Sequence, residues 1–167
     1  GHFYYVIYGR ECPAFAMKEW IPALYEAREN GVGLMLEAWR GSTKSTIMQA
    51  FCWFQLGHKP EGSGMIVAAS DDAATKMGAL FAVVVEQLDG WKMVFPHVIP
   101  DKDRGWGASG YFIKDTRLEY NEFIQKSIND HMRDPSFVGA GISSSDIVGK
   151  HPSVFLLLDD IHDSSNT

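Results

Sequence analysis

The sequence has little of what would place it in several large classes of protein. It holds only two cysteines, Cys12 and Cys52, among 167 residues, too few for a disulfide framework and without the spacing of metal ligands. We therefore expect two reduced thiols, in or near the core of a cytosolic protein. No run of about 18 apolar residues occurs, so we expect no membrane span, and no basic segment followed by an apolar one indicates secretion.

Positive charge is also scarce. Lysine and arginine number 15 against 21 aspartate and glutamate residues, for a net charge of -6. A domain whose main role is to bind nucleic acid usually carries a basic face. If DNA is a partner, we therefore expect this chain to supply the driving force rather than the main DNA-binding surface. The six histidines form no ligand pattern, and no Gly-x-Ser-x-Gly motif or cysteine–histidine set indicates nucleophilic catalysis.

The order of apolar segments predicts an α/β fold. Runs of strand length alternate with stretches of helical spacing, which favours a mostly parallel sheet with helices on both faces. We expect strands at 32–38, 65–69, 110–113, 137–142 and 153–158, and helices at 14–30, 44–56, 71–89 and 118–132. Residues 3–8 are interpreted as a strand or an arm, and 91–110 mostly as loop. Most aromatic residues fall at core spacings, with Trp39 and Trp106 as exceptions in loop sequence.

The most informative part of the chain is the 38–46 segment, Ala38-Trp39-Arg40-Gly41-Ser42-Thr43-Lys44-Ser45-Thr46. It lies between an expected strand and an expected helix, as does a loop that cradles phosphates with its backbone N–H groups. Lys44 fits the lysine that reaches the terminal phosphates, and Ser45 the hydroxyl that binds Mg²⁺. The consensus is not met, because Ala38 and Thr43 stand where glycines are usual and a β-branched residue fits unusual backbone angles poorly. The alternative is a plain turn before a helix with an exposed lysine.

A second segment, Val154-Phe155-Leu156-Leu157-Leu158-Asp159-Asp160, has the pattern of a buried strand that ends in two carboxylates. Ligands of open α/β sheets bind beyond the carboxyl ends of the strands. We therefore assign Asp159 to Mg²⁺, directly or through water, and Asp160 to polarising an attacking water. The alternative is a strand that leaves the core through a turn, where aspartate is common.

A second Gly-Lys pair, Gly149-Lys150, lies in the polar loop before this strand. His151 stands in place of the hydroxyl residue, and Pro152 and a strand follow instead of a helix. We therefore reject this pair as the main phosphate site.

With both segments placed, the chain resembles the ATPase domain of large terminase subunits, the DNA-packaging motors of tailed bacteriophages. Residues 40–46 match the family's variant loop, in which an arginine–glycine pair precedes the lysine and the second glycine is often replaced. Residues 139–152, a glycine-rich stretch followed by Gly149, Lys150 and a short turn, lead into the acidic strand as in that family. The similarity runs from about residue 12 to 165.

The resemblance implies a RecA-like core that hydrolyses ATP with Mg²⁺ and drives double-stranded DNA into a procapsid. Its catalytic residues would be Arg40, Lys44 and Asp160, with Arg40 on the γ-phosphate. Residues Arg40, Gly41, Ser42, Thr43, Lys44, Ser45 and Thr46 would hold the nucleotide, and Ser45 and Asp159 the metal.

The resemblance also implies partners and a setting. The partners would be DNA, a portal protein, a small terminase subunit and further copies in a ring, in the host cytoplasm and away from membranes. The family's nuclease domain is not within residues 1–167, which we interpret as a truncated ATPase domain, with a monomer as the expected state of the isolated fragment.

Two other interpretations stay open. Thr43, and Asp160 in place of the family's usual glutamate, support a module that binds nucleotide without turnover. The third interpretation is another RecA-type or helicase-like ATPase. Arg104, Arg117 and Arg133 are candidates for an arginine that acts between subunits.

Overall fold

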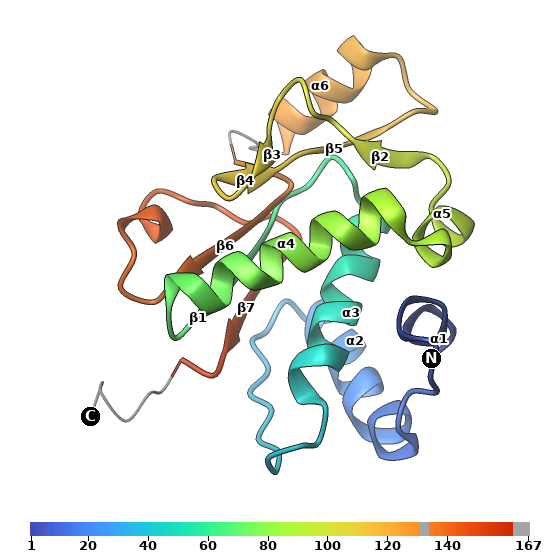
Figure 1. Ribbon diagram of the computed structural model, residues 1–167, viewed down its shortest axis with the longest axis vertical. Coiled ribbons are helices and arrows are strands. Elements are labelled where there is room, and N and C mark those ends of the chain that lie inside the picture. The colour runs from blue at the N-terminus through green and yellow to red at the C-terminus, as the bar shows by residue number, and fades with distance from the viewer. Residues whose placement is uncertain (131–133, 162–167) are drawn as a thin grey trace. The chain divides into compact units, whose positions relative to one another are not determined.

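A computed structural model of the chain describes residues 1–130 and 134–161. The chain divides into two compact units, residues 1–51 and 52–167, and helix α3 (Lys44–His58) contains the boundary. Figure 1 labels the helices and strands of both units. The two segments singled out in the sequence therefore belong to different units.

The first unit is helical. Its elements before α3 are α1 (His2–Tyr8), the π-helical turn η1 (Ala16–Trp20) and α2 (Ile21–Glu29). The helix predicted over 14–30 is confirmed, with a π-helical turn in its first half and Pro22 in the first turn of α2, where its missing N–H costs no hydrogen bond. The strand or arm predicted at 3–8 is a helix, because Phe3, Tyr4 and Ile7 recur at helical spacing and are all buried.

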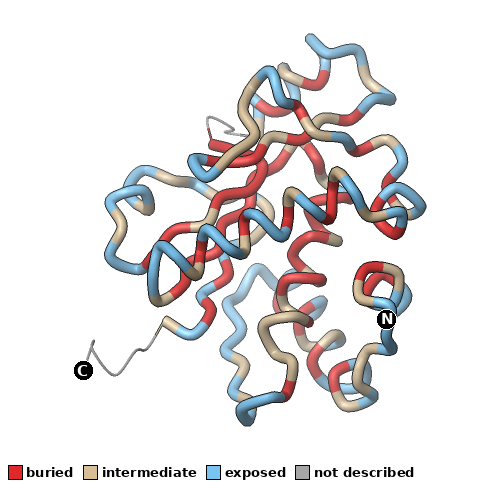
Figure 2. The backbone as a smooth tube through the Cα atoms, viewed as in Figure 1, coloured by how far each residue is buried: buried red, intermediate tan, exposed pale blue. Residues whose placement is uncertain are grey.

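The strand predicted at 32–38 does not form. Residues 32–39 have no regular structure, and Val32, Leu34 and Met35 are 60%, 43% and 84% exposed. Figure 2 shows most of this segment as exposed. Apolar composition alone does not make a strand, since a strand also needs a neighbour for its backbone N–H and C=O groups. Among the described residues this segment belongs to neither sheet.

The second unit contains a sheet of mixed strand direction. In spatial order its strands are β3 (Trp106–Gly107), β4 (Gly110–Tyr111), β6 (Phe137–Gly141), β1 (Gly64–Ala68) and β7 (Phe155–Asp159). β1 pairs in parallel with β6 and with β7, and β4 pairs antiparallel with β3 and with β6. The strands predicted at 65–69, 137–142 and 153–158 are confirmed.

The predicted RecA-like, mostly parallel sheet with helices on both faces is wrong. In the described part of the chain two strand pairings are parallel and three are antiparallel, the third being β2 (Val98–Pro100) with β5 (Ile113–Asp115). The stretch 91–110, expected to be mostly loop, contains β2, β3 and most of helix α5 (Asp89–Val94). A two-residue turn joins β3 to β4, and a turn this short allows only an antiparallel pair. The fold is mixed α and β.

Helix α4 (Asp71–Gln87) packs on the sheet, over β6 and β1 (Figure 1). The Ser70 hydroxyl caps this helix by accepting a hydrogen bond from the N–H of Ala73 at 3.3 Å. The helix approaches β6 closely at Gly139, where a Cβ atom would lie 2.6 Å from the backbone oxygen of Ala74. The start of α4 is thereby held against the strand.

The face of the sheet opposite α4 is only partly covered. It carries Met65, Val67, Val138 and Ala140, against which Ile147 and Ile161 pack. Ile147 belongs to the short 3₁₀ turn η2 (Ser145–Ile147). On the same face of β7, Leu156 and Leu158 are 56% and 53% exposed.

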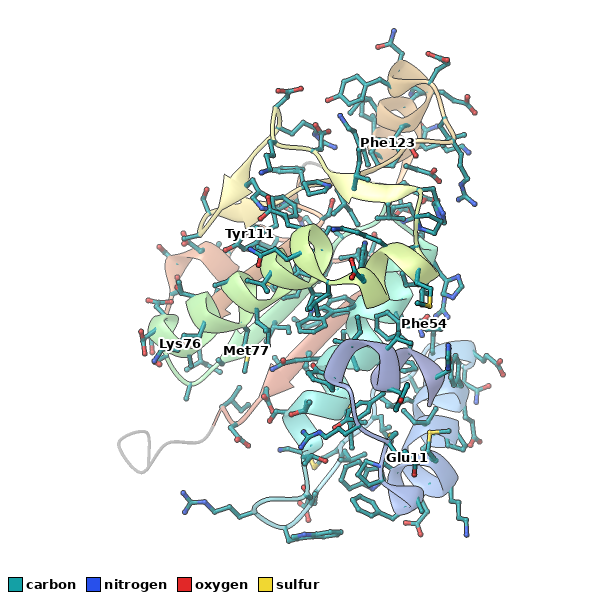
Figure 3. All side chains as sticks on the ribbon, turned by 45° about the vertical axis from the view of Figure 1, so that its right-hand side comes forward. Glu11, Phe54, Lys76, Met77, Tyr111 and Phe123 are labelled. Carbon is teal, nitrogen blue, oxygen red and sulfur yellow. The ribbon has the colours of Figure 1, made fainter. Side chains whose placement is uncertain are left out.

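Aromatic side chains form the centre of the second unit's core. The ring of Phe81 lies 4.6 Å from that of Phe137, and 6.2 Å from the rings of both Trp53 and Trp91, measured between centroids. All four side chains are fully buried, which confirms the prediction that most aromatic residues are core residues. Helix α6 (Tyr120–Asn129), part of the predicted helix 118–132, contributes the buried Phe123, labelled in Figure 3. Residues 131 and 132 of that prediction lie outside the described residues.

Candidate functional site

The 38–46 segment is a turn followed by the start of α3. The N–H of Ser42 donates to the carbonyl of Trp39 at 3.1 Å, and the N–H of Ile47 donates to the carbonyl of Thr43 at 3.0 Å. Lys44 and Ser45 are the first two residues of this 15-residue helix. The first turn of a helix presents backbone N–H groups and a partial positive charge, a combination that attracts anions.

The helix predicted over 44–56 is confirmed. It continues through Gly57, where an end was expected, to His58. A Cβ atom at Gly57 would overlap the ring of Phe95, at 2.4 Å, so this glycine provides room for packing rather than a cap.

Two residues of the turn have left-handed backbone conformations, Gly41 with φ 85° and Thr43 with φ 61°. The second is unexpected for a β-branched side chain, which pays about 1–2 kcal/mol there. Its Oγ1 atom is buried and has no hydrogen-bond partner among the described residues. Position 43 therefore adopts the kind of backbone angle that a glycine usually supplies, and strain of this kind is concentrated at functional sites.

The side chains of this turn differ in exposure. Those of Trp39 and Arg40 are exposed, whereas Ser42 is 5% exposed. Lys44 and Ser45 are half-buried. The guanidinium of Arg40 is therefore accessible to a ligand at the turn, as its predicted role requires.

The acidic strand end lies in the second unit. Asp159 is the last residue of β7, opposite Ala68 of β1, and is 3% exposed. Asp160 follows immediately, is exposed, and has a φ of 44°. The two carboxylates thus have different surroundings, one inside the unit and one at its surface.

The parallel strands bring further polar residues to the same edge. Ala68, Gly141 and Asp159 are in register across β1, β6 and β7, so their carboxyl ends coincide. The Asp71 carboxylate accepts a hydrogen bond from the N–H of Gly141 at 2.7 Å. Asp71 was not singled out in the sequence, and its position shortly after the expected strand 65–69 is the signal that could have placed it at this edge.

Cys52, in the second half of α3, faces the same buried region. It is 3% exposed, and burial together with the negative charge of Asp159 raises the pKa of its thiol. Cys12 is half-buried, and both cysteines are free thiols, as predicted. Cys52 is not suited to nucleophilic chemistry, which requires a thiolate.

Mg²⁺ commonly takes one or two protein carboxylates and completes its shell with water and phosphate oxygens. Within residues 1–130 and 134–161, no group of three or more His, Cys, Asp or Glu side chains could hold a metal ion. When a phosphate supplies other ligands of Mg²⁺, the protein needs to contribute few, and one carboxylate at a strand end is enough. Asp159 meets that description.

The rejected Gly149-Lys150 pair is held by Asp134, which precedes β6. The ammonium group of Lys150 lies 3.4 Å from the carboxylate of Asp134, and that carboxylate also accepts the N–H of His151 at 2.7 Å. No helix begins after this pair; β7 follows it.

Two of the three candidate arginines have partners inside the second unit. The guanidinium of Arg104 lies over the ring of Phe112 at 4.4 Å. Arg117 forms a two-pronged pair with Asp115, with its shortest contact at 2.7 Å. Arg133 lies outside the described residues.

Across the described parts of the chain, no helix has both the length and the apolar character to cross a membrane. Residues 40–46 and the pair Asp159–Asp160 form two local structures, a left-handed turn at a helix start and a strand with carboxylates at its end. Comparison with protein-family models, curated proteins and solved structures found no match for the chain.

Proposed function

We propose that this chain binds Mg-ATP through residues 40–46 and hydrolyses it, as the ATPase of a DNA-packaging motor of the terminase large-subunit type. The observation that supports this most directly is the left-handed Thr43 immediately before a lysine that opens a 15-residue helix. An ordinary helix start does not require a left-handed residue before its first turn, whereas a loop that turns successive N–H groups toward phosphate uses such backbone angles.

In this proposal each residue has a defined role. Lys44 and Arg40 neutralise the charge of the β- and γ-phosphates, and the N–H groups from Gly41 onward hold the phosphate oxygens. Ser45 and Asp159 bind Mg²⁺, which offsets charge on the transferred phosphoryl group, and Asp160 polarises the attacking water. Hydrolysis then drives the movement of double-stranded DNA.

The proposal has two halves, binding of Mg-ATP and its hydrolysis. Calorimetric titration of Mg-ATP into the chain and into Lys44→Ala tests the first half. We expect the variant to bind at least tenfold more weakly. Lys76→Ala is the matched control, because Lys76 is an exposed lysine of α4 (Figure 3) whose ion pair is with the similarly exposed Asp72. Equal binding by the chain and Lys44→Ala would refute the site.

Phosphate release in single-turnover conditions tests the second half. We expect Asp160→Asn to bind Mg-ATP within about twofold of the unaltered chain and to release no phosphate. Binding without phosphate release by the unaltered chain would favour the alternative, a nucleotide-binding module, which the strained Thr43 and the short side chain of Asp160 support. Stimulation of phosphate release by double-stranded DNA tests the packaging role. A release rate unaffected by DNA would contradict the packaging role but not ATP binding or hydrolysis.

A further inference from the structure

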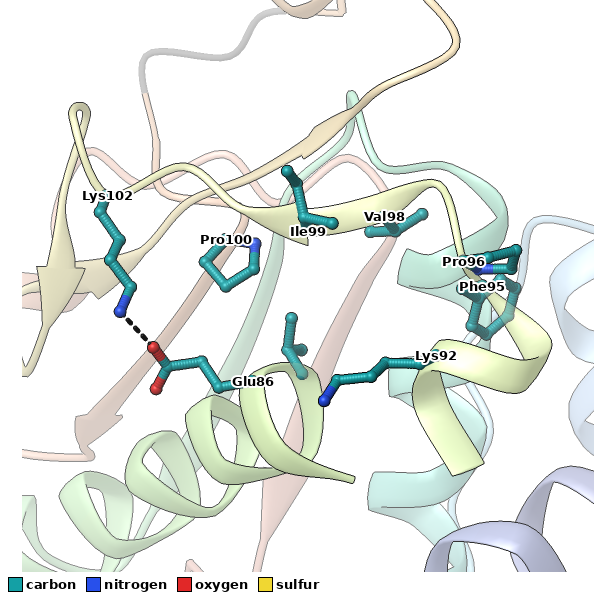
Figure 4. Close-up of a pocket in the computed structure, with 9 residues that line it drawn as sticks. Glu86, Lys92, Phe95, Pro96, Val98, Ile99, Pro100 and Lys102 are labelled. Atoms are coloured by element: carbon teal, nitrogen blue, oxygen red, sulfur yellow. Dashed lines mark ion pairs between the residues drawn. The ribbon is translucent and has the colours of Figure 1, made fainter. Parts of the chain in front are cut away.

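A pocket lies in the second unit, away from the carboxyl ends of β1, β6 and β7. It has a volume of about 520 Å³ and is lined by six apolar and three charged residues. Figure 4 shows β2 along one side and the end of α4 with α5 along the other. Its size falls within the range of about 300–1,000 Å³ that is usual for small-molecule sites.

The apolar lining is continuous with the core. Val85, Phe95 and Val98 contribute to the pocket wall and are only 2–3% exposed. Ile99, on β2, is 37% exposed. A ligand with an apolar body would cover the exposed part of Ile99 and remove it from water.

The strand at the pocket wall cannot accept another strand. The N–H of Val98 donates to the carbonyl of Phe95 at 3.0 Å, and the carbonyl of Val98 accepts the indole N–H of Trp91 at 3.0 Å. Pro100 has no N–H. The carbonyl of His97 accepts the N–H of Thr116, and the N–H of Asp101 donates to the carbonyl of Phe112, so both bonds go to residues that flank β5. The pocket side of β2 therefore offers no N–H group for β-strand addition, so recognition depends on side chains.

The three charged side chains leave one positive charge unmatched. Glu86 and Lys102 form an ion pair, and the hydrogen bond from Lys102 lowers the pKa of Glu86. The ammonium group of Lys92 forms no ion pair or hydrogen bond within the described part of the chain, and the side chain lies along the pocket (Figure 4). An apolar surface beside a single unmatched ammonium group is complementary to an amphipathic anion.

We propose that this pocket binds a small organic anion with an apolar body, of the class of aromatic carboxylates or sulfonates. The apolar body lies on Ile99, Pro96 and Pro100, the apolar lining residues that are exposed or half-buried, and the anionic group pairs with Lys92. The proposal does not depend on nucleotide binding.

The test uses anilinonaphthalene sulfonate as the probe, followed by its fluorescence and by the methyl signal of Ile99 in NMR spectra. We expect saturable binding at one class of site with a shift at Ile99. Lys92→Glu should weaken binding about fivefold or more, since one exposed ion pair is worth up to about that factor and reversal adds repulsion. Lys76→Glu, an exposed lysine on α4 outside the pocket, should change affinity less than twofold.

A neutral analogue, phenylnaphthylamine, separates charge from apolar contact. We expect it to bind at least fivefold more weakly than the sulfonate, and equally to the chain and to Lys92→Glu. Unaltered sulfonate binding in Lys92→Glu would overturn the proposal, as would binding that leaves the Ile99 signal unmoved, because the probe would then lie on another apolar surface.

Discussion

The carboxylate of Asp71 and the backbone N–H of Gly141 are joined by a hydrogen bond of 2.7 Å. Asp71 is the first residue of α4 and Gly141 the last of β6, so one bond holds a helix start to a strand end. The negative charge also favours the first turn of the helix, where the macrodipole is positive. The contact positions α4 at the sheet edge where Asp159 lies.

Gly141 is expected to tolerate no side chain. A Cβ atom there would lie 2.6 Å from the backbone nitrogen of Asp71, and backbone cannot give way as a flexible side chain can. We expect Gly141→Ala to lower the free energy of unfolding by about 2–3 kcal/mol, measured by urea titration. Gly107→Ala is the control, because a Cβ atom there meets nothing within 4 Å. Equal stability of the two variants would show that the start of α4 moves away from Gly141 at little cost in free energy.

Thr43 is a site where glycine should stabilise the protein. Its φ of 61° strains a β-branched residue, so Thr43→Gly should raise the free energy of unfolding by about 1 kcal/mol. Thr43→Ala removes the buried hydroxyl but keeps a Cβ atom in the left-handed conformation, and should give little or no gain. A gain of equal size in both variants would assign the cost to the hydroxyl rather than to the backbone. Thermal unfolding measures both.

The pair formed by Asp115 and Arg117 should make stability depend on acidity. Hydrogen bonds from Arg117 lower the pKa of Asp115 below its ordinary value of 3.8. A carboxyl with a lower pKa in the folded state stabilises the protein above the unfolded pKa, and this contribution is lost as the pH falls through the folded value. We expect urea midpoints to fall below about pH 4, and less so in Arg117→Gln.

The control for this acid dependence is Asp72→Asn, which removes an exposed pair with Lys76 whose side chains are 78% and 75% exposed. It should leave the acid dependence unchanged. A carboxyl NMR titration of Asp115 gives the direct reading, and an ordinary pKa in the unaltered chain would contradict the assignment.

The two thiols should differ in reactivity. Cys52 is 3% exposed, and burial beside Asp159 raises the pKa of its thiol. Cys12 is half-buried, and burial raises the pKa of its thiol as well. We expect iodoacetamide to modify Cys12 in the folded protein, faster at higher pH, and Cys52 only in denaturant. Peptide mass spectrometry identifies the modified residue, and rapid labelling of Cys52 in the folded chain would show that its surroundings open.

Elements with a sustained apolar pattern were predictable from the sequence. Helix α4 presents an apolar face after a serine cap, and β7 is a run of apolar residues before Asp159. The two-residue strand β3 was not predictable, because a period cannot be recognised in so few residues, whereas the strand predicted at 110–113 covers β4 and the first residue of β5. Residues 32–38 have the composition of a strand, but composition does not reveal whether a neighbouring strand exists.

Of the features of the candidate site, some were likewise predictable from the sequence and others were not. Position 43 was recognised as one that needs unusual backbone angles, and the turn has such an angle at Thr43. The bond between Asp71 and Gly141 joins residues 70 positions apart. Such contacts depend on strand order, which local pattern does not encode, and the same holds for the approach of Cys52 to Asp159.

The exposed indole of Trp39 has an optical consequence. Trp39 is 63% exposed and adjoins Arg40, whereas Trp53 and Trp91 are fully buried. Its emission should lie at longer wavelength than theirs, and its indole should be the most accessible to acrylamide. Fluorescence at the red edge of the emission therefore reports on the turn before α3. The chain thus carries its own spectroscopic label at the place where a nucleotide is proposed to bind, and ligand titrations need no added dye.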